Sequence, residues 1–206
     1  MSTSQTWIED GVEIQLYTFA HGNVSKWCEW DSDGTKIAES WLVGGEYHRT
    51  DGPATCEWDS DGTLQVASWL VDGKLHRTDG PASCGWNGDG DVICEAWYKE
   101  GMLHRTDGPA KTDWNDDGTK LAESWLVGGG YHRTDGPATC EWNSDGTVSS
   151  AWYMDGKSYT EDEVRRILAR KSMQDKVLRA SRLLILGQEV PKLYDNILSA
   201  VGRFLD

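Results

Sequence analysis

The side chains with the greatest capacity for chemistry recur in one seven-residue block. The block His-Arg-Thr-Asp-Gly-Pro-Ala occurs four times, and each copy begins 28 residues after the previous one. Histidine exchanges a proton near neutral pH, and arginine binds carboxylates and phosphates through two parallel contacts. One interpretation is therefore a row of anion-binding sites, and the other is a structural motif that holds each repeat together. The residues concerned are His48, Arg49, Asp51, His76, Arg77, Asp79, His104, Arg105, Asp107, His132, Arg133 and Asp135.

The repetition favours the structural interpretation, because every unit of a repeat protein must solve the same packing problem. We expect Asp51 to cap its own turn and Pro53 to bend the chain. We expect Arg49 to pair with a neighbouring acid and His48 to pack on Trp41. The two residues before each block differ from copy to copy, so something holds the seven residues themselves constant.

The sequence predicts no enzyme, no cofactor and no bound metal. The loops of the Asp31–Gly34 type lack the glutamate of a calcium-binding EF-hand, and asparagine replaces their first aspartate in later copies. A repeated cysteine position, filled once by Thr112, contains no CxxC pair and so favours neither zinc nor disulfides. Four equivalent His-Arg-Asp sets are not the design of a single active site, and no nucleophile elbow or phosphate loop is present. The repeated cysteines are Cys28, Cys56, Cys84 and Cys140.

The charge of the chain excludes further classes of partner. The 206 residues include 34 acidic and 20 basic side chains, and residues 1–159 alone carry 27 acidic and 11 basic ones. This negative charge repels nucleic acids and anionic membranes. The chain has no run of 18 apolar residues, and its first ten residues do not resemble a secretion signal. We therefore expect a cytoplasmic protein, in the host cytoplasm if the protein is viral.

Two columns of tryptophan share the 28-residue period and indicate a β-repeat architecture. The first comprises Trp30, Trp58, Trp86, Trp114 and Trp142, and the second comprises Trp41, Trp69, Trp97 and Trp125. Each repeat also contains a turn such as Asp31–Gly34 and a two-residue hairpin signal such as Gly44-Gly45. Two reversals per repeat keep all copies in one orientation, so we interpret Asp-Gly-Pro as a kink within one long strand. The sequence predicts a mainly β fold, an elongated antiparallel sheet of tandem 28-residue β-hairpin repeats with a C-terminal α-helical segment.

The turns also predict a register for the strands. Across Gly44-Gly45, Val43 should face Glu46, and Ser40 should face Arg49. Across Asp31–Gly34, Trp30 should face Thr35, Glu29 should face Lys36, and Cys28 should face Ile37. Alternation then places both tryptophan columns on one face, together with Cys28 and Ile37.

The chain divides into three predicted segments. Residues 1–26 form a degenerate N-terminal cap repeat, 27–159 form the tandem repeats, and 160–206 form a helical segment. Thr160 and Glu163 predict a capping box that opens a first helix. A second helix is expected at 177–186, ending near Gly187, and a third is expected from Pro191.

The repeat resembles the MORN and MORN-like class of β-hairpin repeats. The closest correspondence is the segment from Trp69 to His76, in which an aromatic residue and two others precede Asp-Gly-Lys. The seven-residue block also resembles a motif of uncharacterised repeat proteins of phages and large viruses. The resemblance covers residues 27–158 and implies an interaction scaffold.

These observations leave three functions from different classes. The first is a non-enzymatic protein–protein interaction module, as in a phage or viral inhibitor that binds a host defence protein, with a homodimer also open. The second is a module that binds or sequesters a nucleotide or sugar through its Trp, His and Arg rows, and the third is an acidic mimic of DNA. For the first, the predicted contact residues are Trp30, Trp41, Trp58, Trp69, Trp86 and Trp97.

Overall fold

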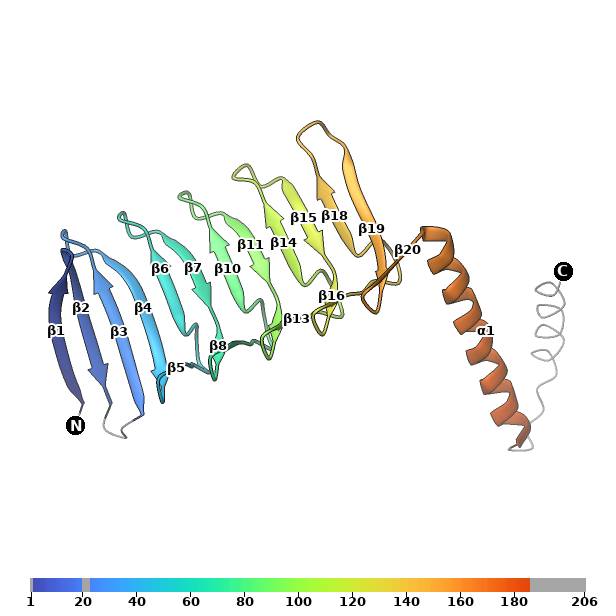
Figure 1. Ribbon diagram of the computed structural model, residues 1–206, viewed down its shortest axis with the longest axis horizontal. Helices are drawn as coiled ribbons and strands as arrows, with labels where there is room; N and C mark the ends of the chain where they lie inside the picture. The colour runs from blue at the N-terminus through green and yellow to red at the C-terminus, as the bar shows by residue number, and fades with distance from the viewer. Residues whose placement is uncertain (1, 20–22, 186–206) are drawn as a thin grey trace. The chain divides into compact units, whose positions relative to one another are not determined.

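The computed structural model describes residues 2–19 and 23–185 of the chain. It divides into two compact units, residues 1–158 and 159–206. The first unit contains one long antiparallel sheet whose strand order follows the order of the chain, and the second contains a helix (Figure 1). The predicted fold class, a mainly β chain with an antiparallel sheet of hairpins and a C-terminal helical segment, is confirmed.

The elements have the following bounds. The strands are β1 Thr3–Glu9, β2 Val12–Thr18, β3 Val24–Trp30, β4 Lys36–Val43, β5 Glu46–Tyr47, β6 Thr55–Trp58, β7 Leu64–Ser68, β8 Leu70–Val71, β9 Lys74–Leu75, β10 Ser83–Trp86, β11 Val92–Ala96, β12 Tyr98–Lys99, β13 Met102–Leu103, β14 Lys111–Trp114, β15 Lys120–Ser124, β16 Leu126–Val127, β17 Gly130–Tyr131, β18 Thr139–Trp142, β19 Val148–Met154 and β20 Lys157–Tyr159. The helix is α1, Glu161–Ile185.

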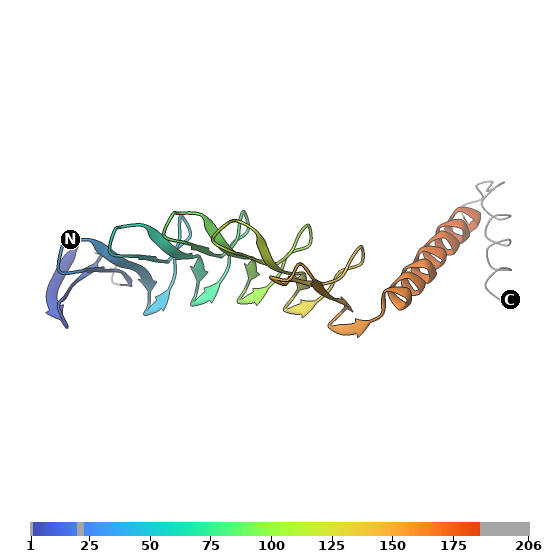
Figure 2. The ribbon, with the colours of Figure 1, turned by 90° about the horizontal axis from the view of Figure 1, so that it is seen from above.

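Each of the three middle repeats adds two strands to the main sheet and one separate short hairpin beside it, whereas β5 and β20 pair within the main sheet itself. In the second repeat β6 and β7 belong to the main sheet, whereas β8 and β9 pair only with each other. The short hairpins β8–β9, β12–β13 and β16–β17 each follow the second main-sheet strand of their repeat, along the same edge of the sheet (Figure 1). Seen from above, the repeats follow one another along the sheet in the same orientation (Figure 2). Two main-sheet strands per repeat keep all copies in one orientation, as the sequence predicts. The described part of residues 1–26 contributes β1, β2 and the start of β3 to the same sheet.

The prediction that Asp-Gly-Pro is a kink within one long strand is wrong. The whole block from His76 to Ala82 lies outside strands, and it connects β9 to β10 as an irregular segment. Its backbone groups bond outside a regular ladder. The N–H of Arg77 donates to the carbonyl of Tyr98 in the next repeat, and the carbonyl of Ala82 accepts from the N–H of Trp69 at 2.7 Å. Arg49 therefore does not face Ser40, whose partner is Thr55. The predicted pair Val43–Glu46 is confirmed.

The predicted register across Asp31–Gly34 is also wrong, because this turn and the equivalent turns of the next three repeats end in a β-bulge. Trp30 pairs with Lys36 and Glu29 pairs with Ala38, so Ile37 is left without a partner across the strand. The N–H of Asp31 donates to the carbonyl of Thr35, and Gly34 adopts φ 82°, a geometry that admits glycine most readily. Cys28 consequently faces Glu39, not Ile37.

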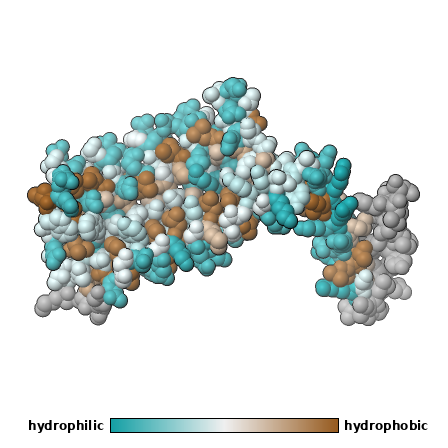
Figure 3. All heavy atoms as spheres, in the orientation of Figure 1, coloured by the Kyte–Doolittle hydropathy of each residue, from teal (hydrophilic) through white to brown (hydrophobic). Residues whose placement is uncertain are grey.

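The core is thin because a single sheet has few places that exclude water. The alanine that closes each block is completely buried in all four copies. The repeated cysteine positions belong to a row of residues that pair directly across neighbouring strands of the main sheet. In order, the row is Cys28, Glu39, Cys56, Ala67, Cys84, Glu95, Thr112, Glu123 and Cys140. Apolar side chains gather along the middle of the visible face, while the turn edge is largely hydrophilic (Figure 3).

Up to residue 185, where the described part of the second unit ends, there is one helix where the sequence predicts two. The capping box is confirmed: the Glu163 N–H donates to Thr160 Oγ1 at 3.3 Å, and the Thr160 N–H donates to the Glu163 carboxylate at 2.8 Å. The helix then continues without a break to Ile185, because Lys171–Lys176 contains no glycine or proline to end it. The expected end near Gly187 and the helix from Pro191 lie outside the described residues. No helix in the described ranges has the length and apolarity to cross a membrane.

Candidate functional site

The arginine of each block is held in place by three contacts. Arg77 Nε donates to Asp79 Oδ1 at 2.8 Å, and its Nη1 donates to the carbonyl of Pro81 at 3.3 Å. Its guanidinium lies over Trp69, with 4.0 Å between Cζ and the ring centroid. The other three copies repeat this arrangement with ring distances of 4.7, 4.0 and 3.9 Å. The arginines therefore bind within their own repeats.

The glycine of the block is required by this close approach. A β-carbon at Gly80 would lie 2.8 Å from Arg77 Cζ, and at Gly108 and Gly136 the corresponding distance to the arginine is 2.7 Å. Any side chain here would push the guanidinium off the tryptophan ring. The motif therefore contains glycine because arginine occupies the space of its side chain.

The aspartate of the block completes the pair. The hydrogen bond from Arg77 and its positive charge lower the pKa of Asp79 below its ordinary value. The pKa values of Asp51, Asp107 and Asp135 are lowered by the equivalent arginines. These carboxyl groups are exposed, so each ion pair contributes modestly to stability.

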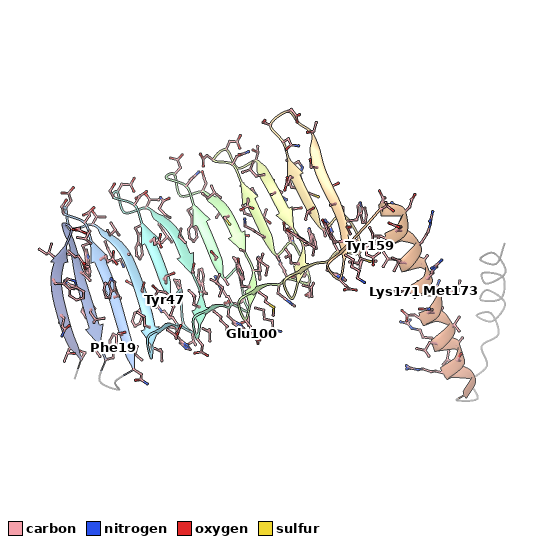
Figure 4. All side chains as sticks on the ribbon, viewed as in Figure 1. Phe19, Tyr47, Glu100, Tyr159, Lys171 and Met173 are labelled. Atoms are coloured by element: carbon pink, nitrogen blue, oxygen red, sulfur yellow. The ribbon has the colours of Figure 1, made fainter. Side chains whose placement is uncertain are left out.

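The histidine of each block joins its repeat to the next one. Nδ1 of His48 accepts a hydrogen bond from the N–H of Asp72 at 3.2 Å, and Nδ1 of His76 accepts one from the N–H of Glu100 at the same distance. His104 and His132 make the same contact with Gly128 and Asp155. Each N–H belongs to the tight turn of a hairpin in the following repeat, the region where Figure 4 marks Glu100.

Two backbone hydrogen bonds reinforce each of these junctions. The N–H of Gly73 donates to the carbonyl of Tyr47 at 2.9 Å, and the N–H of Arg49 donates to the carbonyl of Leu70 at 3.0 Å. Aspartate at position 72 tolerates its φ of 49° less well than glycine would, and its carboxylate lies 2.9 Å from His48 Nδ1. The histidine is thus part of an inter-repeat clamp. Arg49 lies over Trp41, with 4.7 Å between Cζ and the ring centroid.

The two tryptophan columns have different surroundings. We call the first set the turn column (Trp30, Trp58, Trp86, Trp114 and Trp142) and the second the bend column (Trp41, Trp69, Trp97 and Trp125). An arginine lies over every ring of the bend column. In the turn column, Lys36 lies over Trp58 at 4.2 Å and Lys120 over Trp142 at 5.5 Å. No cation from the described segments lies over Trp86 or Trp114.

All twelve tryptophans are half-buried, and none is completely buried or fully exposed. Trp30 and Trp41 line one groove of ≈ 340 Å³, so in the first repeat the two columns share a face. Ile37, predicted on the same face, instead lines a second groove of ≈ 730 Å³ together with Ala38 and Leu70. The six tryptophans predicted to contact a partner therefore divide between a covered column and a more open one.

The groove beside Trp41 contains a charged cluster that sequence reasoning missed. Glu39 accepts a hydrogen bond from Lys36 Nζ at 2.8 Å and one from Trp41 Nε1 at 3.0 Å, and Lys26 Nζ lies 3.0 Å from its carboxylate. Burial acts to raise the pKa of Glu39, but the hydrogen bonds from Lys36, Trp41 and Lys26 lower it to about 2. Phe19 stacks on Trp41, with 5.8 Å between the ring centroids. Figure 4 marks Phe19 near the end of the early strands.

The sequence could have predicted this cluster only from the correct strand register. Glu39 is two residues before Trp41, as Glu95 and Glu123 are before Trp97 and Trp125, but only the bulge places these acids in the cysteine row. The Nε1 atoms of Trp97 and Trp125 are buried without a hydrogen-bond acceptor within residues 2–19 and 23–185. The first bend tryptophan is therefore the best satisfied of the three.

The cysteines and the aspartate loops have structural surroundings. Burial raises the pKa of the Cys28, Cys56, Cys84 and Cys140 thiols, and it raises that of Cys94 to about 11. A raised pKa keeps a thiol protonated and unreactive. Asp31 Oδ1 accepts hydrogen bonds from the N–H groups of Asp33 and Thr35, so this aspartate caps its own turn. The described residues contain no group of three His, Cys, Asp or Glu side chains arranged to bind a metal ion.

No protein-family model matches the chain, and no curated protein matches it.

Proposed function

We propose that the chain is a non-enzymatic protein–protein interaction module of the MORN-like kind, whose partner is a protein. In a phage or virus, that partner is a host defence protein, and binding inhibits it in the host cytoplasm. The observation that carries the proposal is the half-burial of every tryptophan in the described sheet. Tryptophan is enriched at binding hot spots, because a large ring removes much apolar area from water at a small cost in side-chain entropy.

The turn column supplies the contact surface in this proposal. Its rings lie on every second strand of the main sheet, and Trp86 and Trp114 have no cation over them among the described residues. The bend column contributes less, because each of its rings already stacks with an arginine. Of the six tryptophans predicted from the sequence, this division keeps Trp30, Trp58 and Trp86 as expected contact residues and adds Trp114. Trp41, Trp69 and Trp97 instead hold the repeats together.

The test compares the double variant Trp86→Ala/Trp114→Ala with the charge reversal Glu57→Lys. Glu57 is exposed in the same sheet, but its side chain points to the opposite face from Cys56 and Trp58. Each purified protein is immobilised, exposed to host lysate, and its bound proteins are identified by mass spectrometry. We expect the tryptophan variant to fold, by circular dichroism, and to lose a partner that Glu57→Lys retains. The reverse pattern would contradict the proposal.

An acidic mimic of DNA is the second candidate, and one observation favours it. The turn edge presents an exposed aspartate in every repeat: Asp33, Asp61, Asp89, Asp117 and Asp145. Hydrogen bonds from Thr119 and Thr147 lower the pKa values of Asp117 and Asp145, which keeps both charged in mild acid. A partner bound to this edge would dissociate steeply as salt increases, whereas a partner on the tryptophans would not.

A small-ligand function that uses the Trp, His and Arg rows has less support. The arginine donors are engaged by aspartate and by the proline carbonyl, and the histidine Nδ1 atoms accept backbone hydrogen bonds. An anion would have to displace these contacts in order to bind.

A further inference from the structure

The main sheet has an open edge at strand β1. No strand lies on the outer side of β1 among the described residues (Figure 1). Asp10 and Gly11 form a two-residue turn with φ values of 50° and 83°, and Glu9 pairs with Val12 across it. In such a hairpin the closing pair exchanges both of its hydrogen bonds, and bonded pairs then alternate along the strand. The backbone groups that point away from β2 are therefore those of Ser4, Thr6 and Ile8.

This edge lacks the features that usually prevent strand addition. Edge strands are commonly short, bulged, or protected by lysine and proline. β1 has seven residues, contains neither lysine nor proline, and pairs with β2 without a bulge. Its Ile8 is 73% exposed, the most exposed of the large apolar side chains described. By contrast, β20 at the other end of the sheet has three residues and begins with Lys157.

We propose that β1 pairs with β1 of a second copy, antiparallel and across a two-fold axis, so that the two sheets become one. The outward-directed residues of the two strands must face each other for hydrogen bonds to form. Centring the pair on Thr6 aligns all of Thr3–Glu9 with its copy. Thr6 then exchanges two hydrogen bonds with Thr6 of the second copy, and Ser4 does so with Ile8. Other registers leave part of the strand unpaired.

The charges allow this arrangement in spite of the acidity of the sheet. Glu9 is the one charged residue of β1, and in the centred register it faces Thr3 of the second copy. The two Glu9 side chains then lie at opposite ends of the ladder, ~20 Å apart at ~3.4 Å per residue. That separation exceeds the Debye length of ~8 Å at physiological salt. In this register β1 pairs with its copy over its full length and opposes no like charges, which favours a second copy over a foreign strand.

The first test is the mass of the protein in solution. Light scattering after size exclusion should give twice the chain mass of 23.0 kDa for the unaltered protein and one chain mass for Thr6→Pro. Proline at Thr6 removes an outward N–H but no hydrogen bond to β2, so the fold should survive. Ile8→Lys should raise the dimer dissociation constant at least about tenfold, because lysine protects edge strands. The control Val148→Lys alters another exposed apolar residue and should leave the dimer intact.

The second test is the register. Thr6→Cys should form a disulfide-linked dimer under mild oxidation, because directly opposed residues have Cα atoms about 5.5 Å apart. Ile8→Cys should not, because Ile8 faces Ser4. A monomer at every concentration, or a dimer unaffected by Thr6→Pro and Ile8→Lys, would overturn the proposal. Retention of the lysate partner by Thr6→Pro would show that the edge and the tryptophan surface act separately.

Discussion

The bend column and the turn column contain the same residue at the same period, yet they have different environments. A bend tryptophan lies where the main sheet ends and the short hairpin begins. Its backbone N–H donates a hydrogen bond to the carbonyl of the alanine that closes the block. The irregular segment that follows returns an arginine to the ring. A turn tryptophan is the last residue of its strand, and in the first four repeats it lies next to a bulge, where the chain does not return. The difference teaches that the local path of the backbone, more than residue type, decides which aromatic rings are structural.

The largest expected effect is on stability when a bend tryptophan is removed. Trp97→Ala should lower the free energy of unfolding by about 3 kcal/mol, since it leaves a cavity and also frees Arg105. Trp86→Ala should cost about 1 kcal/mol, because that ring is half-buried and no cation of the described residues lies over it. Urea unfolding followed by circular dichroism measures both. Equal losses would mean that the two columns share one role.

The sequence predicts the repeat, the antiparallel strands and the two-strand parity, because period and turn residues depend on local interactions. The arginine–aspartate pair was also expected from residue type. The bulge after Asp31–Gly34 was missed, because a four-residue turn and a bulged turn have the same residues and differ by one hydrogen bond. That single bond decides that Cys28 faces Glu39. The histidine contact was missed because it joins residues 24 positions apart across a repeat boundary.

Substitution of the glycine of the block tests whether this residue allows the arginine to cover the bend tryptophan. Gly80→Ala should cost about 1–2 kcal/mol, because the new methyl group displaces the Arg77 guanidinium from Trp69. Arg77→Ala should cost a similar amount. In the double variant the two costs should not add, since the methyl group has no arginine left to displace. Additive costs in a thermal or urea unfolding series would place the role of Gly80 elsewhere.

The acid sensitivity of the first bend tryptophan provides a smaller effect. The pKa of Glu39 is lowered to about 2 in the folded protein, so its stabilising effect is present above its ordinary pKa near 4.5. The effect is lost as pH falls from there towards 2. Replacing it by Glu39→Gln should flatten the pH dependence of stability in that window by about 1 kcal/mol, after solvent screening.

The same window contains a background that a control must remove. The pKa values of four other carboxyl groups are also lowered, so their protonation destabilises the unaltered protein in the same pH window. These groups are Asp51, Asp79, Asp107 and Asp135. Only the difference between the unaltered protein and Glu39→Gln reports on Glu39. Glu123→Gln is a matched variant. Glu123 pairs with Lys120 and is the second residue from one end of the cysteine row, as Glu39 is from the other end. If Glu39→Gln changes the pH dependence of stability no more than Glu123→Gln does, the groove beside Trp41 has no special role.

The smallest expected effect on stability comes from placing a lysine over a turn tryptophan that has no cation over it among the described residues. The position occupied by Lys36 and Lys120 is occupied by Leu64 and Val92 in the two repeats between them. Lys36 and Lys120 each lie over the turn tryptophan of the following repeat, so Trp86 is the ring that a lysine at position 64 would approach. Leu64→Lys should place an ammonium over Trp86 and offset part of the lost apolar contact, since an exposed cation–π pair contributes about 0.5–1 kcal/mol. The net change in unfolding free energy should stay within about 0.5 kcal/mol, and Leu64→Gln, which has no charge, should be the less stable variant. The same lysine would cover the ring that the interaction surface uses, so binding of a protein partner should weaken although the fold does not. If Leu64→Lys leaves that binding unchanged while Trp86→Ala abolishes it, the exposed face of the ring is not the contact, and the division between the columns reflects packing alone.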